Sequence, residues 1–139
     1  MDKRALAALY IRTLVSIEDE TGSLAPVTAS HEEEEATHVI TAWNPGEERP
    51  TPEENTSANN RLHSELVRRG LLPRRAIGAD PTADHFEESW AVVGLDDDEA
   101  RAIGAAFGQV AVFRIHGGTQ TVLACTETWT LSRHLSGSA

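Results

Sequence analysis

Six polar residues in this sequence have types and spacings that favour a binding site. Asn44 ends the segment "HVITAWN", whose β-branched and aromatic residues predict a strand. Asn55 and Asn59 follow in a predicted helix, at helical spacing, on the same stripe as two leucines further along. An amide on the core-facing side of a helix requires hydrogen-bond partners. We therefore expect the amides of these three asparagines to line one corner of the fold.

Glu87, Ser89 and Gln109 complete this polar set. Glu87 and Ser89 share one face of the predicted strand "EESWAVVGL", because alternate residues of a strand point to the same side. Gln109 follows a helix end and enters a strand, a junction at which side-chain amides often satisfy backbone groups. The candidate ligand-binding residues are Asn44, Asn55, Asn59, Glu87, Ser89 and Gln109.

Two interpretations of this set remain open. The first is a pocket rich in amides with one carboxylate, which suits a neutral polar ligand such as a base, a sugar or an amide. The second is a hydrogen-bond lock that ties loops to the sheet, because buried polar networks also specify folds. In the first case the side chains face a cavity, and in the second they face one another.

Other chemistry has less support. Glu87 is a candidate general acid or base, but neighbouring Glu88 points to the opposite strand face and is a poor partner. His85 lies close in sequence, although a solvated loop histidine is the stronger interpretation. The histidines show no HxH, HxxxH or HExxH spacing, so we expect neither a metal site nor a cofactor. Cys125 is interpreted as a small apolar strand residue.

Composition indicates one acidic domain over residues 1–139. The formal net charge of −10 argues against direct nucleic-acid binding, which needs clustered Lys and Arg. We expect no membrane span, no secretory signal and a cytoplasmic location, with a single cysteine fitting a reducing compartment. The expected partner is a small polar ligand or a basic protein, and the oligomeric state stays open.

Capping residues along the chain predict where the helices begin. Thr51 and Glu54, and again Asp96 and Glu99, form capping-box patterns that begin helices over residues 52–69 and 97–107. Residues 20–37, with four consecutive glutamates (Glu32–Glu35), are expected to form an acidic surface loop, and residues 132–139 a frayed tail.

The element order predicts an α+β fold. Strand, helix, strand, strand, helix, strand is the split βαβ pattern of ferredoxin-like proteins. We therefore expect a single-domain two-layer sandwich with a ferredoxin-like βαββαβ core and extra N- and C-terminal strands.

Several motifs together resemble the bacterial domain-of-unknown-function 3293 family. They are "ITAWNP", an asparagine at a helix start, "EESWAVVGL" and "FGQVAVF", and the resemblance extends from about Leu9 to Val122. The sequence departs from the family in its longer acidic loop before His38 and its extra segment after Thr126. The resemblance implies a small α+β domain without an accepted activity. Its motif residues here are Thr41, Trp43, Asn44, Pro45, Asn55, Glu87, Ser89, Phe107, Gly108 and Gln109.

The functional expectation is therefore a small ligand-binding domain that uses the polar corner. One alternative is an acidic interaction or regulatory module, in which the same residues are a structural lock and a flat apolar patch includes Trp129. A second alternative is an enzyme with Glu87 as its general acid or base.

Overall fold

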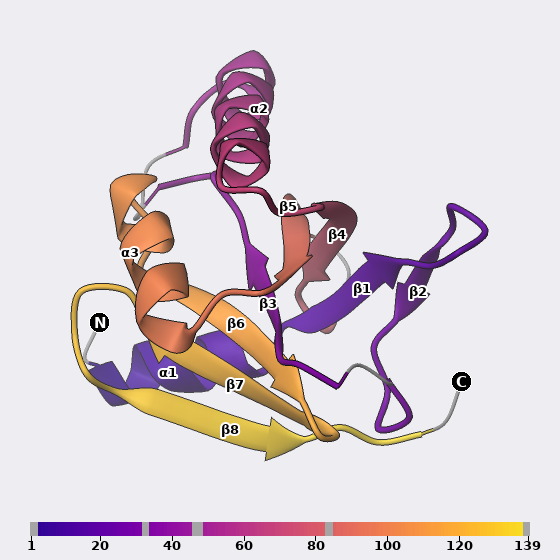
Figure 1. Ribbon diagram of the computed structural model, residues 1–139. Coiled ribbons are helices and arrows are strands. Elements are labelled where there is room, and N and C mark those ends of the chain that lie inside the picture. The colour runs from indigo at the N-terminus through magenta and orange to yellow at the C-terminus, as the bar shows by residue number, and fades with distance from the viewer. Residues whose placement is uncertain (1–2, 32–33, 46–48, 83–84, 138–139) are drawn as a thin grey trace.

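One antiparallel sheet of eight strands organises the chain (Figure 1). The computed structural model describes residues 3–31, 34–45, 49–82 and 85–137. The helices are α1 (Lys3–Ile11), α2 (Pro52–Arg68) and α3 (Asp97–Ala106). The strands are β1 (Leu14–Glu18), β2 (Leu24–Pro26), β3 (Thr37–Ile40), β4 (Arg74–Ala79), β5 (Phe86–Val93), β6 (Ala111–His116), β7 (Thr119–Ala124) and β8 (Thr130–His134). Their order in the sheet is β2-β1-β4-β5-β3-β6-β7-β8, with every neighbouring pair antiparallel.

The starts of α2 and α3 confirm the two capping-box predictions. The Thr51 hydroxyl accepts from the Glu54 backbone N–H, and the Glu54 carboxylate accepts from the Thr51 N–H. Asp96 and Glu99 make the same reciprocal pair at the start of α3. These bonds satisfy N–H groups that have no partner inside a helix. Helix α2 ends before Gly70, whose φ of 85° lies in the left-handed region that glycine adopts readily.

Helices α2 and α3 cover one face of the sheet, which we call the outer face (Figure 1). Leu62 and Leu66 of α2 and Ile103 of α3 are buried there against the sheet. The sheet residues of this cluster include Ile40, Val92, Val112 and Leu123. This burial of apolar area contributes most of the favourable energy that holds the helices in place.

Helix α1 packs on the opposite, inner face, against β7 and β8. Its C-terminal end is tied to these strands by two buried or half-buried side chains. The Arg133 guanidinium donates to the Ile11 and Thr13 carbonyls at 2.8 and 3.2 Å, and the Gln120 amide donates to the Thr13 carbonyl at 2.9 Å. A cation beside the last carbonyls of a helix also complements the helix dipole. We call this arrangement the α1 clamp.

The mixed α+β class predicted from the sequence is confirmed, and two segments differ from the expectation. Residues 20–37 include β2, which pairs with β1, and Thr37 already belongs to β3. Residues 132–139 include the end of β8, and Leu135 beyond it is buried, with its N–H bonded to the Gly118 carbonyl at 2.8 Å. Strand β2 pairs with β1, and β8 pairs with β7, so each pairs with the strand that precedes it in the chain. The polar residues of these segments gave no sign of this pairing.

Of the predicted glutamate run, Glu32 and Glu33 lie outside the described residues, whereas Glu34 and Glu35 are exposed. None of the described helices has both the length and the apolar character needed to cross a bilayer.

Candidate functional site

The site begins where β3 stops. The sequence predicted a strand through Asn44, but β3 ends at Ile40. The Thr41 hydroxyl donates to the Glu88 carbonyl at 2.6 Å and accepts from the Trp43 N–H at 3.0 Å. A side chain that bonds to nearby backbone in this way competes with the ladder of a sheet, so the strand ends early.

Asn44 and Asn55 form a reciprocal pair. The Asn44 backbone N–H donates to the Asn55 amide oxygen at 3.0 Å, and the Asn55 side-chain N–H donates to the Asn44 amide oxygen at 3.0 Å. Asn44 has a φ of 45°, a left-handed conformation that costs other non-glycine residues more than it costs asparagine. The predicted approach of these two asparagines is confirmed, and Asn55 fixes the direction in which Asn44 points.

Asn59 holds the same segment from one helical turn further on. Its amide oxygen accepts from the Ala42 backbone N–H at 3.3 Å. Asn55 and Asn59 are each 5% exposed, so α2 presents two buried amides to the chain that leaves β3. Both are therefore positioning residues behind the site, and neither lines a cavity together with Glu87.

The side chain of Asn44 also contacts Glu87. The Asn44 side-chain N–H donates to Glu87 Oε2 at 3.0 Å, and His85 Nε2 lies 3.6 Å from the same oxygen. Burial raises the pKa of Glu87, while the Asn44 hydrogen bond and the nearby His85 and Arg49 act in the opposite direction and only partly offset it. A carboxyl group whose pKa is shifted by burial and by specific neighbours is a candidate functional group.

Gln109 ties the start of the β6 segment to the same corner. Its side-chain N–H donates to the Trp43 carbonyl at 3.0 Å. The preceding residue, Gly108, has a φ of 75°, and a Cβ added there would lie 2.7 Å from Pro45 Cβ. Only glycine fits this contact without displacing Pro45. The "FGQ" and "WNP" segments are therefore joined directly in space.

A cavity of about 660 Å³ opens beside these residues, between α1 and the inner face. We call it the α1 cavity. Of the six predicted residues, it is lined by Asn44, Glu87, Ser89 and Gln109. Its apolar walls include Leu6, Leu9, Val39, Ala111 and Phe113, and its other polar lining includes Tyr10, Arg12, Thr41, Arg49, Asp80 and His85.

Tyr10, Arg12 and Arg49 are lining residues that sequence reasoning did not select. Burial, followed by the charge of Glu87, raises the pKa of Tyr10 to about 12, so its phenol stays protonated at neutral pH. The one available signal was a tyrosine in a helix otherwise built mainly of alanine and leucine. No spacing rule connects α1 to residues near position 87, because the contact depends on the sheet that lies between them.

Glu87 provides a pH-dependent prediction. Its raised pKa means that, above the ordinary glutamate range, the folded protein retains a proton that the unfolded chain has released. Stability should therefore fall as the pH rises through this interval and level off above the folded pKa. Thermal unfolding measured between about pH 4 and pH 8 should show this fall in stability for the parent, and Glu87→Gln should lack it. The control is Glu88→Gln, an exposed neighbour on the opposite strand face; equal slopes in all three proteins would contradict the prediction.

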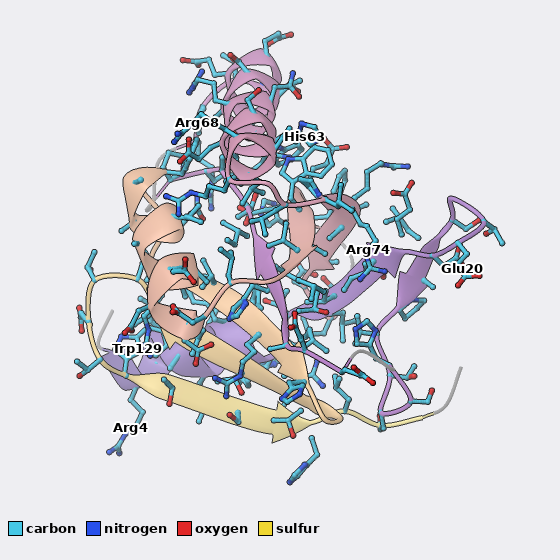
Figure 2. All side chains as sticks on the ribbon, in the orientation of Figure 1. Arg4, Glu20, His63, Arg68, Arg74 and Trp129 are labelled. Atoms are coloured by element: carbon cyan, nitrogen blue, oxygen red, sulfur yellow. The ribbon has the colours of Figure 1, made fainter. Side chains whose placement is uncertain are left out.

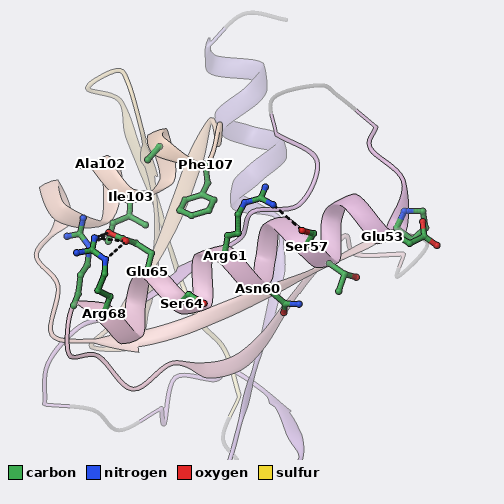
Figure 3. Close-up of a pocket in the computed structure, with 14 residues that line it drawn as sticks. Glu53, Ser57, Asn60, Arg61, Ser64, Glu65, Arg68, Ala102, Ile103 and Phe107 are labelled. Carbon is green, nitrogen blue, oxygen red and sulfur yellow. Dashed lines mark hydrogen bonds and ion pairs between the residues drawn. The ribbon is translucent and has the colours of Figure 1, made fainter.

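A larger groove of about 1020 Å³ lies between α2 and α3 (Figure 3). Ile103 and Phe107 line it on the α3 side, and the exposed polar side of α2 forms the other wall. Its arginines already have partners: Arg68 pairs with Glu65 at 2.6 Å, and Arg61 donates to the Ser57 hydroxyl at 3.1 Å. None of the six predicted residues lines this groove, so its size alone does not make it the stronger candidate.

A polar network on the outer face links α3 to the sheet. His38, 1% exposed, lies with Nε2 2.8 Å from Asp97 Oδ1, and Arg114 donates to the other carboxylate oxygen. Burial acts to raise the pKa of Asp97, but the hydrogen bond from His38 and the charge of Arg114 outweigh it, and the net pKa is lowered. This network anchors the first turn of α3 over β3 and β6.

Comparison with known proteins matches the middle of the chain to a protein family. A family model described as "Protein of unknown function (DUF3293)" matches residues 40–112. No curated protein and no solved structure matches the chain. The matched residues include all six predicted site residues, while α1, β7 and β8 lie outside them. The chain belongs to the DUF3293 family.

Proposed function

We propose that this protein binds a small polar molecule in the α1 cavity, through Asn44 and Glu87. The observation that carries the proposal is the convergence of Asn44, Glu87, Ser89 and Gln109 on one cavity of about 660 Å³. Small-molecule sites are typically concave, between about 300 and 1,000 Å³, and mostly apolar with a few well-placed polar groups. The α1 cavity has this size and this combination of walls.

The hydrogen-bonding capacity left at Glu87 supports the proposal. Asn44 and His85 both approach Oε2, and no described residue donates a hydrogen bond to Oε1. The hydroxyl of Tyr10, which lies close enough for its pKa to be affected by Glu87, likewise has no hydrogen-bond partner among the described residues. A ligand in the cavity can use both groups, and a buried carboxyl oxygen gains from such a partner.

The hydrogen-bond lock and the ligand pocket are then two parts of the same polar corner. Asn55 and Asn59 use their amides on backbone N–H groups, and Asn55 also bonds the Asn44 amide. Asn44 consequently presents its N–H group to Glu87 and not to solvent. Pre-organising a binding group in this way lowers the entropy lost when a ligand binds.

A specific observation also favours a second candidate function. Glu87 combines a raised pKa with a place in a cavity, which is a property of general acids and bases that work near neutral pH. In this case Glu87 exchanges a proton with the bound molecule, and Asn44 holds the carboxylate in position. Conversion of a bound compound that stops in Glu87→Gln while binding persists would support the enzyme over the binding domain.

The interaction-module alternative has less support. Trp129, the residue expected in a flat apolar patch, is half-buried at the connection between β7 and β8, and its carbonyl accepts from the Ala124 N–H at 3.2 Å (Figure 2). The exposed side chain of Glu20 extends from the connection between β1 and β2 in the same view.

The fold and location form part of the proposal. The central strand order is β4-β5-β3-β6, in which α2 connects β3 to β4 and α3 connects β5 to β6, each across one intervening strand. This order supports a ferredoxin-like core within one domain. Cys125, a free and half-buried thiol whose pKa burial raises to about 12, supports a cytoplasmic location in a reducing compartment.

A ligand screen with two matched variants tests the proposal. We expect at least one compound from a metabolite and nucleotide library to raise the melting temperature of the parent. Glu87→Ala should lose that response, because the binding carboxyl group is removed. Glu88→Ala should keep it, since Glu88 is exposed on the other face of β5. A parent that responds to no compound, or a response that survives in Glu87→Ala, would count against the α1 cavity.

A further inference from the structure

We infer that the ligand of the α1 cavity carries an anionic group, a carboxylate or a phosphate, together with a hydrogen-bond donor. In this arrangement Arg12 and Arg49 receive the anionic group, and Oε1 of Glu87 receives the donor. The inference rests on the proposed function and specifies the chemical class of its ligand. It replaces the neutral ligand expected from the six polar residues with an anionic one.

The two arginines differ from others in the chain. Arg68, Arg101 and Arg114 form ion pairs with carboxylates on their own or neighbouring elements. Arg12 and Arg49 both line the α1 cavity, and neither makes a hydrogen bond or an ion pair with another described residue. Two guanidinium groups that line the same cavity and form no ion pair with a described carboxylate leave their planar donors available to an anion.

The described carboxylates that line the cavity do not form ion pairs with Arg12 or Arg49. Asp80 uses Oδ1 within the β4–β5 turn, where it accepts from the Thr82 N–H at 3.0 Å and the Thr82 hydroxyl at 2.7 Å. Glu87 lies within range of the Arg49 charge but directs Oε2 to Asn44. The positive charge of the arginines is therefore not neutralised by ion pairs from within the described lining.

The rest of the lining limits the ligand further. Leu6, Val39 and Phe113 supply apolar walls between the polar groups, so the molecule has an apolar portion as well. Glu87 is the one lining glutamate, and its unused oxygen suits an N–H or O–H group. A simple inorganic anion satisfies the arginines but leaves Oε1 without a partner. An organic carboxylate or phosphate that also carries an amine, amide or hydroxyl group satisfies both.

Ligand-detected NMR with a fragment library tests this inference. The library contains four classes of aromatic and aliphatic fragments: anions with a donor, anions without one, cations, and neutral donors. Anions with a donor should bind most tightly and should compete with one another. Arg12→Gln and Arg49→Gln should each weaken their binding by about 10- to 100-fold, the loss expected from one charge-assisted hydrogen bond. Carboxylates and phosphates are compared within this class, so that the better anion is identified by its affinity.

Arg4→Gln is the matched control. Arg4 is an exposed arginine in α1, the helix that Arg12 directly follows; its side chain extends away from the fold, and it does not line the cavity (Figure 2). It should leave affinity unchanged, and thermal unfolding should show that all three variants fold. Cavity binding that is lost in Glu87→Gln but equal in the parent, Arg12→Gln and Arg49→Gln would overturn the anionic group while leaving the proposed function intact. A library in which no class binds in a Glu87-dependent way would overturn both.

Discussion

Replacing Leu66 by alanine is expected to lower the free energy of unfolding by about 2–5 kcal/mol. Leu66 is 0% exposed and lies in the cluster that joins α2 to the outer face of the sheet. Removing its terminal carbons loses their transfer free energy and leaves a cavity, which α2 cannot easily close because a capping box fixes its start. Urea denaturation monitored by circular dichroism measures the change.

The adjacent residue supplies the control for this prediction. Val67 is 50% exposed, so Val67→Ala should change the same free energy by no more than about 0.5 kcal/mol. The two variants shorten neighbouring aliphatic side chains of one helix and differ mainly in burial. Similar losses in both would show that the buried side of α2 is assigned wrongly.

Asn55→Ala should cost about 1–3 kcal/mol and should also weaken ligand binding. The substitution removes the acceptor of the Asn44 backbone N–H and the donor to the Asn44 amide oxygen. Asn44 then loses the contacts that hold it at a φ of 45° and direct its side chain to Glu87. The structural loss should occur with or without a ligand, which denaturation of the free protein can show.

Asn60→Ala is the corresponding control, because Asn60 is an exposed asparagine on the same helix. It should be neutral or slightly stabilising, since alanine has the better helix propensity. An Asn55→Ala protein as stable as Asn60→Ala would exclude the lock. A destabilised Asn55→Ala protein that binds as tightly as the parent would separate the lock from the site.

The parts of the fold that were predictable from sequence depend on local chemistry. The capping boxes at Thr51 and Asp96 and the glycine at position 70 act within a few residues, and the helices begin and end where those residues require. Asn55 was recognisable because an amide interrupts an apolar stripe and must find a partner. Its partner, Asn44, lies only eleven residues away along the chain.

The parts that were missed depend on contacts that residue type does not reveal: polar pairing between neighbouring strands, and contacts between segments far apart in the chain. Strand β8 has mostly exposed residues, and its pairing with β7 includes a bond of 2.7 Å between the Thr121 and Ser132 hydroxyls that composition does not indicate. The lining residues Tyr10 and Arg12 reach the site only because α1 crosses the inner face. Neither position carries a local signal for that crossing.

The α1 clamp has a consequence for the order in which the site can form during synthesis. Arg133 reaches the Ile11 carbonyl across a separation of 122 residues, and Gln120 reaches the Thr13 carbonyl across 107. When residues 40–112 have left the ribosome, Asn44, Glu87 and Gln109 can already meet, but the helix that covers them has no anchor. During synthesis, the α1 clamp is therefore complete only after both Gln120 and Arg133 have emerged.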